Sequence, residues 1–260
     1  MQQVFIDDVM VGNEYVTITG DDVHHIRDVL RMKPGEKIRV STSSGRNMYC
    51  ELAEFGAEFI QADILDEVAA DTELTSQVVI FQGLPKGDRM ETIIKKSVEL
   101  GVHEVVPVRM RYCVKKLEGK KEANKLKRWQ SCSESAAKQS KRSSVPQIHK
   151  PLSFAEALDY AHDFDLILIP YENKNGMAAT ADALDLVRPG MQIGVFIGPE
   201  GGFAEEELAM LPEKAQVISL GRRILRTDTA AITAMAMLML RLEAQSADTE
   251  QSTKSTVEAS

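Results

Sequence analysis

Two glycine-rich segments in the last third of the chain carry the residue types and spacing that point most directly to ligand chemistry. The first is Ile197–Phe203, with the sequence IGPEGGF, and the second is Leu220–Ala230, with the sequence LGRRILRTDTA. Each follows a β-branched run and precedes a helical pattern, so each is predicted to form a turn from a strand to a helix. Glycine lets the backbone pass close to a ligand and adopt positive φ, which favours a site lined by main-chain donors and acceptors.

The spacing of these glycines argues against the common nucleotide-binding fingerprints. Residues 197–203 do not form the G-x-G-x-x-G pattern, and they lack the Lys-Ser/Thr pair of a P-loop. No acidic residue follows such a pattern at the sequence spacing that binds the ribose of a dinucleotide, which makes a dehydrogenase a remote alternative. The two segments therefore predict a ligand site of a different kind at adjacent strand ends. Tight turns without a ligand are the alternative interpretation of the same glycines.

The first 70 residues read as a small β-barrel. Five short runs of strand-forming residues are separated by turn residues, and one helical stretch covers about residues 21–30. Polar residues at 68–76 mark a domain boundary. The predicted strands are 4–6, 15–18, 37–41, 48–54 and 58–65.

From residue 77 the pattern alternates between apolar strands and helices, which predicts an α/β domain. Alternation of this kind is typical of a mostly parallel sheet that helices cover on both faces. The segment at 244–260 has one aliphatic residue beyond alanine, so we expect a disordered tail there. The predicted strands are 78–84, 104–110, 166–170, 194–198 and 217–220.

Charge is unevenly distributed along the chain. The net charge is −8, yet residues 86–150 hold 17 Lys/Arg against 7 Asp/Glu, and the other residues hold 14 against 32. A solvated helical face is one interpretation of the basic segment. Such segregation is also expected of a protein that binds a polyanion through local phosphate contacts. The acidic total therefore does not exclude RNA as a partner.

Cysteine use and hydropathy predict a cytoplasmic protein without a metal site. Cys50, Cys113 and Cys132 are odd in number and lack C-x-x-C spacing, which favours reduced thiols and argues against zinc. His24 and His25 would point about 100° apart on a helix, and we expect neither to have a carboxylate partner at ligand spacing. No apolar run reaches the length of a bilayer span, and the N-terminal residues do not resemble an export signal.

Three further blocks accompany the two glycine-rich segments. They are residues 24–36, which contain HHIRDVLRM and PGE; residues 86–102, which contain KGDRM and ELGV; and residues 128–146, which contain RW, ESAAKQS and VP. The five blocks, in register across about 200 residues, resemble the RsmE family of small-subunit rRNA uridine-N3 methyltransferases, part of the SPOUT class. Two positions depart from the family pattern: Asp228 stands where glutamate is usual, and Ala204 where a helix-capping serine is common.

The resemblance implies both a fold and an activity. The expected architecture is a PUA-like β-barrel RNA-binding domain at 1–70 and a SPOUT methyltransferase domain at 73–243, the latter with a deep C-terminal trefoil knot. The expected reaction is methylation of N3 of a specific uridine in 16S rRNA, with S-adenosylmethionine as cofactor. The implied partners are the rRNA or the small ribosomal subunit, and a second copy of the chain. We expect the homodimer to form through the helix after Arg226, which is apolar nearly all round from Ala230 to Leu240.

Two other functions fit the same residues. A related SPOUT methyltransferase would act on tRNA or on a ribose 2′-hydroxyl, although the block at 24–32 favours the uridine-N3 family by resemblance. A non-catalytic RNA-binding module would keep the barrel and the basic segment beside vestigial cofactor loops. The intact glycines of residues 197–203 and the presence of Arg226 speak against that module.

Individual residues take candidate roles in this reaction. Arg226 is the first catalytic candidate, because a guanidinium can stabilise a uridine anion as the N3 proton leaves. An ion pair of Arg226 with Asp228 or Glu200 that merely orders the loop is the alternative. Glu200 is either a general base, which would need a raised pKa, or a residue that orients the loop. The cofactor-binding candidates are Ile169, Pro170, Gly198, Pro199, Gly201, Gly202, Leu220, Gly221, Ile224 and Leu225.

Candidates for RNA contact come from both predicted domains. Arg27 and Arg31 are four residues apart and would share a helix face, which suits either phosphate or solvent. Trp129 stands among lysines and Arg128, where it either stacks on a base or packs into the core. The full set of RNA-binding candidates is Arg27, Arg31, Lys86, Arg128, Gln139 and Arg142.

Overall fold

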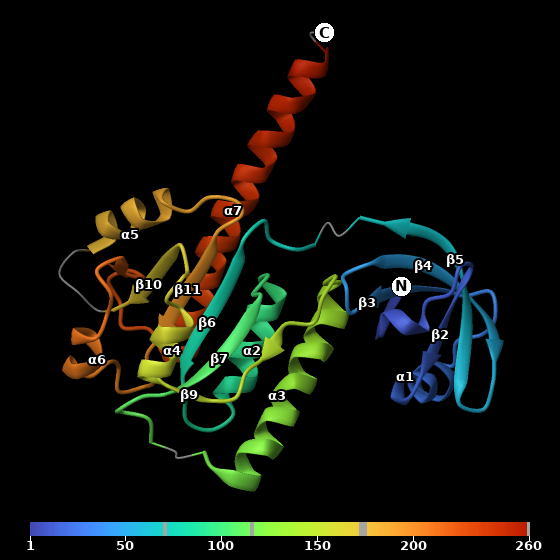
Figure 1. Ribbon diagram of the computed structural model, residues 1–260, viewed down its shortest axis with the longest axis horizontal. Coiled ribbons are helices and arrows are strands. Elements are labelled where there is room, and N and C mark those ends of the chain that lie inside the picture. Colours follow the sequence, from blue (N-terminus) through green and yellow to red (C-terminus); the bar gives the residue numbers. More distant parts are fainter. Residues whose placement is uncertain (70–71, 115–116, 172–175, 259–260) are drawn as a thin grey trace. The chain divides into compact units, whose positions relative to one another are not determined.

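The structure is a computed structural model that describes residues 1–69, 72–114, 117–171 and 176–258 (Figure 1). The chain divides into two compact units. Unit 1 comprises Met1–Glu73 and Ala137–Val145, and unit 2 comprises Leu74–Ala136 and the chain from Pro146 onward. The predicted boundary near residues 70–73 did not include the return of residues 137–145 to unit 1. That return is explained by polar contacts, because Lys138 donates to Asp22 and Arg142 donates to Glu73, both of which lie in the first segment.

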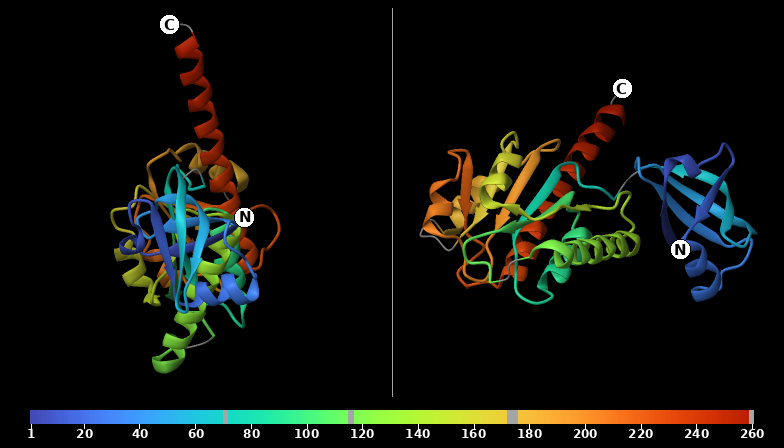
Figure 2. Two further views of the ribbon diagram at one scale, coloured as in Figure 1. Left: turned by 90° about the vertical axis from the view of Figure 1, so that its right-hand side faces the viewer. Right: turned by 60° about the horizontal axis from the view of Figure 1, so that its bottom comes forward.

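Unit 1 is built on a five-stranded sheet that curves into a half-barrel (Figures 1 and 2). Its strand order is β1-β3-β4-β5-β2, with β1 and β3 parallel and the remaining pairs antiparallel. Alternate strand residues such as Val16, Ile18, Ile38 and Val40 are fully buried in one core. All five predicted strands are confirmed. Their bounds are β1 Gln2–Ile6, β2 Tyr15–Thr19, β3 Lys37–Thr42, β4 Asn47–Phe55 and β5 Phe59–Val68.

The helical stretch of unit 1 matches the predicted range to within one residue. It consists of α1 (Asp21–His24) and a π-helical turn, η2 (His25–Val29), and a short 3₁₀ helix, η1 (Asp8–Met10), precedes it. Arg31 follows the helix in the left-handed region with φ of 55°, so it does not share a helix face with Arg27. The prediction of a shared face is therefore wrong, because the chain has already turned out of the helix.

Polar contacts in this helical region also differ from expectation. The Nδ1 atom of His24 lies 2.6 Å from a carboxylate oxygen of Asp28, so His24 does have a carboxylate partner one turn away. Arg27 donates from Nη1 to the carbonyl oxygens of Gly56 and Ala57, at 3.1 and 3.2 Å. These bonds hold the Arg27 side chain against the β4–β5 turn, where it is half-exposed.

Arg142 is a structural residue rather than a phosphate contact. Its side chain is 3% exposed, and its Nε donates to Glu73 Oε1 at 2.9 Å. Burial alone would raise the pKa of Glu73, but the hydrogen bonds from Arg142 and from the backbone amides of Ser143 and Ser144 hold that pKa below its ordinary value. The prediction that Arg142 binds RNA is wrong, because its guanidinium is enclosed and paired.

Unit 2 is built on a seven-stranded parallel sheet. Its order is β12-β10-β11-β6-β7-β8, and β9 also pairs with β7. Every pair in it is parallel, which confirms the predicted type of sheet. The two-residue strands β8 and β9 were not predicted, because runs so short leave no periodicity. The bounds are β6 Gln77–Gly83, β7 Glu104–Arg109, β8 Gln147–Ile148, β9 Leu152–Ser153, β10 Leu166–Pro170, β11 Gln192–Ile197 and β12 Ala215–Ile218.

Helices cover both faces of this sheet (Figures 1 and 2). On one face, Phe154 and Ala157 of α4 pack against Phe81 and Phe196, whose rings stack at 4.3 Å between centroids. On the other face, α2 packs against α7, which in turn contacts β11. The trefoil knot that the resemblance implies stays a prediction. The helices are α2 Arg89–Glu99, α3 Gly119–Ser140, α4 Phe154–Tyr160, α5 Gly176–Asp185, α6 Glu205–Ala209 and α7 Thr227–Glu258.

The last helix, α7, differs from expectation in length and in burial. It continues to Glu258, through most of the segment expected to be a disordered tail. Extension of an existing helix needs no new nucleus, so polar residues can continue it. In the part of α7 whose side chains the structure describes, one stripe is buried, including Met235 at 0% exposure, whereas Leu240 is 69% exposed.

Candidate active site

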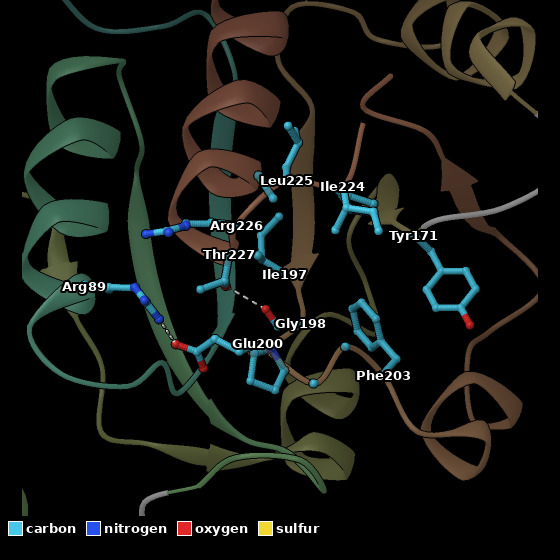
Figure 3. A pocket seen from close by; sticks show the side chains of 15 residues that line it. Arg89, Tyr171, Ile197, Gly198, Glu200, Phe203, Ile224, Leu225, Arg226 and Thr227 are labelled. Atoms are coloured by element: carbon cyan, nitrogen blue, oxygen red, sulfur yellow. Dashed lines mark hydrogen bonds and ion pairs between the residues drawn. The ribbon is translucent and has the colours of Figure 1, made fainter. Parts of the chain in front are cut away.

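Both glycine-rich segments lie at the carboxyl edge of the parallel sheet. Strand β10 has β11 on one side and β12 on the other, so the three strand ends meet there. Ligand sites in open α/β sheets occur at this edge. A cleft of about 640 Å³ opens at this position (Figure 3). Its lining residues are Arg89, Pro170, Tyr171, Ile197, Gly198, Pro199, Glu200, Gly201, Gly202, Phe203, Ile224, Leu225, Arg226, Thr227 and Ala230.

A smaller cleft of about 380 Å³ adjoins the first. The two share Pro170, Tyr171, Ile224, Leu225 and Ala230, and the smaller one is completed by residues 219–223. The structure therefore brings together nine of the ten predicted cofactor-binding residues. The tenth, Ile169, is 0% exposed and belongs to the core beneath the cleft, so its prediction as a wall residue is wrong. Alternation along β10 explains this, since neighbouring side chains point to opposite faces.

The first glycine-rich loop is shaped by close packing. Gly202 has φ of 72°, and its amide donates to the carbonyl oxygen of Pro199 at 2.9 Å. A Cβ atom on Gly198 would lie 3.2 Å from Gly202, and one on Gly83 would lie 2.6 Å from the Pro199 ring. The absence of side chains at these positions lets the loop fold back against the end of β6. Its backbone is thereby held at the cleft.

A buried threonine ties this loop to α7. The Thr227 hydroxyl donates to the carbonyl oxygen of Gly198 at 2.7 Å and accepts from Nε2 of Gln82 at 2.9 Å. Thr227 is 5% exposed and Gln82 is fully buried. Sequence reasoning missed both residues. One signal was available, because Gln82 is a polar residue inside the otherwise apolar run of β6.

The second glycine-rich loop is anchored by α5. The Thr180 side chain donates to the carbonyl oxygen of Ser219 at 2.7 Å and accepts from the Ser219 amide at 2.9 Å. Gly221 has φ of 115°, which a residue with a side chain rarely adopts. Beyond it, the Ile224 side chain is 83% exposed. The loop thus presents backbone and hydrocarbon to the cleft.

Arg226 is an unpaired cation in the cleft. Its side chain is exposed, and within the described parts of the chain it makes neither a hydrogen bond nor an ion pair. In Figure 3 it points toward α2, on the same side of the cleft as Arg89. The alternative of an ion pair with Asp228 or Glu200 does not match this geometry. The guanidinium is therefore free to meet an anionic group of a ligand.

Glu200 is engaged by other residues. Its carboxylate pairs with the Arg89 guanidinium and accepts the backbone N–H of Lys86 at 2.9 Å. Partial burial would raise the pKa of Glu200, but backbone hydrogen bonds and the pairing with Arg89 outweigh burial and hold that pKa below its ordinary value. A carboxylate with a lowered pKa is a poor proton acceptor, so the geometry favours the loop-orienting role over that of a base.

The two positions that depart from the family pattern have local explanations. Ala204 precedes α6 without a capping hydroxyl, yet its amide donates to Glu207 Oε2 at 2.9 Å, which keeps half of a capping box. Asp228 lies in the first turn of α7, where a carboxylate favours the helix dipole. Its Oδ1 atom is buried and has no hydrogen-bond partner among the described residues.

The RNA-binding candidates of unit 2 are not gathered into one motif. Lys86 is exposed beside the cleft, and its backbone is bonded to Glu200. Arg128 is 59% exposed on α3 and donates to Glu91 at 2.7 Å. Trp129 is 3% exposed, so the prediction that it packs into the core is confirmed. In unit 1, Gln139 is exposed near the end of α3.

The described residues contain neither a cluster of metal ligands nor a candidate membrane-spanning helix. In this part of the chain, His, Cys, Asp and Glu side chains do not gather in groups of three that could hold a metal ion. No helix in the described ranges has the length and apolar character needed to cross a bilayer.

Comparisons with known proteins match most of the chain to described domains. Residues 72–239 match the model of an RNA methyltransferase domain, and residues 18–65 match that of an RNA methyltransferase PUA domain. The ribosomal RNA small subunit methyltransferase E of Bacillus subtilis (strain 168) is 36% identical over 231 residues, which cover 87% of this chain and 90% of the relative.

Two solved structures are similar over nearly their whole length. A ribosomal RNA small subunit methyltransferase E from Neisseria gonorrhoeae, bound to S-adenosyl methionine, is 33% identical with a TM-score of 0.78, and the match covers 91% of this chain and 96% of that one. A putative methyltransferase from Legionella pneumophila, in complex with the cofactor SAM, is 26% identical with a TM-score of 0.80, covering 92% and 96%.

Proposed function

Since the chain belongs to the RNA methyltransferase family of the ribosomal RNA small subunit methyltransferase E proteins, we propose that it methylates N3 of one uridine in 16S rRNA with S-adenosylmethionine as the methyl donor. The observation that carries the proposal is the cleft itself. Two glycine-rich loops, an arginine side chain without a partner among the described residues and an apolar wall converge at the carboxyl edge of the sheet. This combination fits a cofactor with a neutral base and a substrate that becomes anionic.

The residues of the cleft suit S-adenosylmethionine. Adenine is neutral, so main-chain amides and carbonyls between apolar side chains can bind it. We assign this role to the backbone of Gly198, Gly201, Gly202, Leu220, Ile224 and Leu225, with Pro170, Pro199 and Gly221 shaping the walls. Phe203 and Tyr171, whose rings are 6.3 Å apart between centroids, add aromatic surface beside the loops. When bound, the cofactor supplies an electrophilic methyl group on a sulfonium.

Arg226 is assigned to the developing charge on the substrate. Uridine N3 carries a proton that must leave before or as the N3–methyl bond forms, and negative charge then spreads to O2 and O4 of the ring. A guanidinium held in the cleft stabilises that charge and offers a planar fork to the ring oxygens. The carbon–sulfur bond breaks with its electron pair remaining on sulfur, so the products are N3-methyluridine and a neutral thioether.

Glu200 is assigned to positioning rather than to proton transfer. Its carboxylate is held by Arg89 and by the Lys86 amide, and its lowered pKa makes it a weak base at neutral pH. The N3 proton therefore passes to solvent in this mechanism. Fixing cofactor and uridine in attack geometry supplies much of the acceleration, about 7–11 kcal/mol in well-oriented systems.

We infer a homodimer as the working unit, formed through α7. Leu240 presents a large apolar side chain to solvent at 69% exposure, and Ile224 does so beside the cleft at 83%. Residues 230–240 of α7 are apolar nearly all round, and a helix of this composition needs cover on more faces than its own chain supplies. The rRNA or the small ribosomal subunit is the proposed substrate, which places the protein in the bacterial cytoplasm.

Mass-spectrometric mapping of small-subunit rRNA tests the function directly. In cells without the gene, one methylated uridine should be lost from 16S rRNA, and re-expression should restore it. Purified protein with S-adenosylmethionine should then restore the same modification in vitro. Loss of a tRNA or ribose methylation instead would assign the protein to a different RNA. Binding of RNA without binding of S-adenosylmethionine, measured by calorimetry, would support a non-catalytic module.

A further inference from the structure

A second pocket of unit 2 shares a chain segment with the methyl-transfer cleft. Arg89 lines the cleft, whereas its neighbours Gly87 and Met90 line a separate pocket of about 590 Å³. Pockets of about 300–1,000 Å³ are typical of sites for small molecules. A ligand in this pocket would therefore lie next to a substrate in the cleft, with the turn at Gly87–Met90 between them.

The pocket has apolar walls, and one buried side-chain donor of its described lining lacks a partner. Leu84, Met90 and Leu117 contribute hydrocarbon surface, and Trp129, the one aromatic residue of the described lining, is 3% exposed. In the part of the chain that the structure describes, Nε1–H of Trp129 has no hydrogen-bond acceptor. Buried N–H groups nearly always have a partner, so this donor marks a position where the acceptor of a ligand fits.

Cations lie along one side of the pocket. Lys121, Asn124 and Lys125 all line it from α3, at the i, i+3 and i+4 positions that share a helix face. Lys125 Nζ is 3.4 Å from carboxylate oxygens of both Asp88 and Glu91, so its charge is partly balanced. The Arg128 side chain, which also pairs with Glu91, lies 59% exposed on the same helix. The surroundings therefore remain net positive.

We propose that this pocket binds one nucleotide of the RNA substrate that neighbours the target uridine. The base lies among the apolar walls, one of its ring acceptors receives the Trp129 N–H, and its phosphate meets Lys121 and Lys125. Flat bases on apolar or aromatic surface beside lysines are the usual arrangement for unpaired RNA. This inference rests on the proposed function, because it specifies how the same enzyme holds the strand on either side of the Gly87–Met90 turn.

Trp129 provides a direct optical test, since it is the only tryptophan of the chain. The full-length protein is titrated with in vitro transcribed 16S rRNA, and its tryptophan emission is corrected for absorbance with a free tryptophan derivative. Saturable quenching of the wild-type emission is expected, because a base would contact the indole. S-adenosylmethionine alone should leave the emission unchanged, because it occupies the other cleft.

Two matched variants identify the pocket as the source of the signal. Asn124→Phe introduces bulk at the pocket from an exposed position, whereas Ala123→Phe places the same ring on an exposed neighbouring position outside the pocket lining. Asn124→Phe should abolish the quenching and raise the RNA Kd roughly tenfold, the size of one lost base contact. Ala123→Phe should change neither. Trp129→Phe keeps an aromatic ring but removes the N–H, and should raise KM for RNA while kcat at saturating RNA is retained.

The outcomes separate this inference from the proposed function. If wild-type protein methylates the transcript and Asn124→Phe shows the same quenching and affinity as wild type, the pocket does not bind RNA and only this inference fails. Quenching by S-adenosylmethionine alone would also overturn it. If wild-type protein methylates no small-subunit rRNA under any condition, the proposed function itself fails.

Discussion

The hydroxyl group of Thr227 donates a 2.7 Å hydrogen bond to the carbonyl oxygen of Gly198, although 29 residues separate them in the chain. The same hydroxyl accepts a hydrogen bond from the side chain of Gln82, 145 residues earlier. One buried oxygen atom therefore joins the end of β6, the first glycine-rich loop and the first turn of α7. The geometry of the cleft depends on this junction.

Thr227→Val should weaken cofactor binding and destabilise the protein. Valine has nearly the same shape but leaves the Gln82 amide and the Gly198 carbonyl without their partner, at a cost of about 1–3 kcal/mol. Thr227→Ser should retain most of the affinity, because the hydroxyl remains. The control is Thr229→Val, an exposed residue two positions along α7. Calorimetry with S-adenosylmethionine and thermal unfolding measure both effects, and equal behaviour of the two valine variants would contradict the junction.

Arg226→Ala should lower the single-turnover methylation rate far more than it weakens cofactor or RNA binding. Loss of one preorganised donor to a developing negative charge typically costs about 10²–10³ in rate. Arg226→Lys should retain only part of the wild-type methylation rate, since an ammonium group cannot reproduce the planar fork of a guanidinium. Higher pH should restore some rate to Arg226→Ala, because more uridine is then already deprotonated. Equal losses in affinity and rate, without rescue at high pH, would make Arg226 a scaffold residue.

Glu200→Gln should destabilise the protein at neutral pH and leave methylation largely intact. The pKa of Glu200 is lowered in the folded chain, so its stabilisation is present above the ordinary value of 4.5 and is lost as pH falls through the folded-state value. We expect a deficit of about 1 kcal/mol at pH 7 that shrinks toward zero in acid. Glu206→Gln, an exposed carboxylate on α6, is the control in denaturant titrations at several pH values. A large rate loss with normal stability would instead indicate a general base.

Charge reversal of exposed cations should weaken RNA binding without changing cofactor affinity. Lys86→Glu and Arg128→Glu should each reduce the salt dependence of RNA binding by about one unit of slope, because one phosphate contact is lost. Arg142→Ala should behave differently. Removal of its buried guanidinium leaves Glu73 unpaired and should cost on the order of 3 kcal/mol of stability. RNA binding that does not respond to salt would contradict the electrostatic footprint.

Leu240→Glu should dissociate the dimer and leave each subunit folded. Its side chain is 69% exposed in the single chain, so a charge there opposes association and not folding. A shift of about tenfold or more in the dimer Kd is expected in sedimentation velocity. Met235→Glu should unfold the protein, since Met235 is fully buried. Val9→Glu changes an exposed residue of unit 1 and should leave assembly unchanged. If the dimer survives Leu240→Glu, the face of α7 that carries Leu240 is not the dimer interface.

The strands and the location of the site follow from the sequence because local patterns report them. Apolar strand runs, turn residues between them and glycines at strand ends are visible without any coordinates, and the longer strands of both sheets match them. Arg226 and Glu200 were found through the glycine-rich segments that contain them. Their partners were not, because Arg89 lies 111 residues from Glu200 and no local pattern reports that contact.

The wrong predictions concern residue types that occur both in binding sites and in purely structural roles. Arg142 and Arg128 stand in the same basic segment, yet the first is enclosed by Glu73 and the second is exposed, a difference that only tertiary contacts create. Arg31 was assigned to the helix face of Arg27 because the two are four residues apart, whereas the backbone of Arg31 turns to positive φ. Ile169 was assigned to the cleft by proximity in sequence, and the pleat of β10 turns it inward.

During synthesis of the chain, the residues that complete the cleft are made late. All of its lining residues except Arg89 lie between Pro170 and Ala230, and the last of them belong to the first turn of α7. A nascent chain that stops before residue 227 has made every strand of the parallel sheet but lacks the hydroxyl that joins the glycine-rich loop to the helix. We therefore expect newly made chains to acquire affinity for the methyl donor in one late step. Arrested chains of increasing length should begin to bind S-adenosylmethionine only after Ala230 has left the exit tunnel.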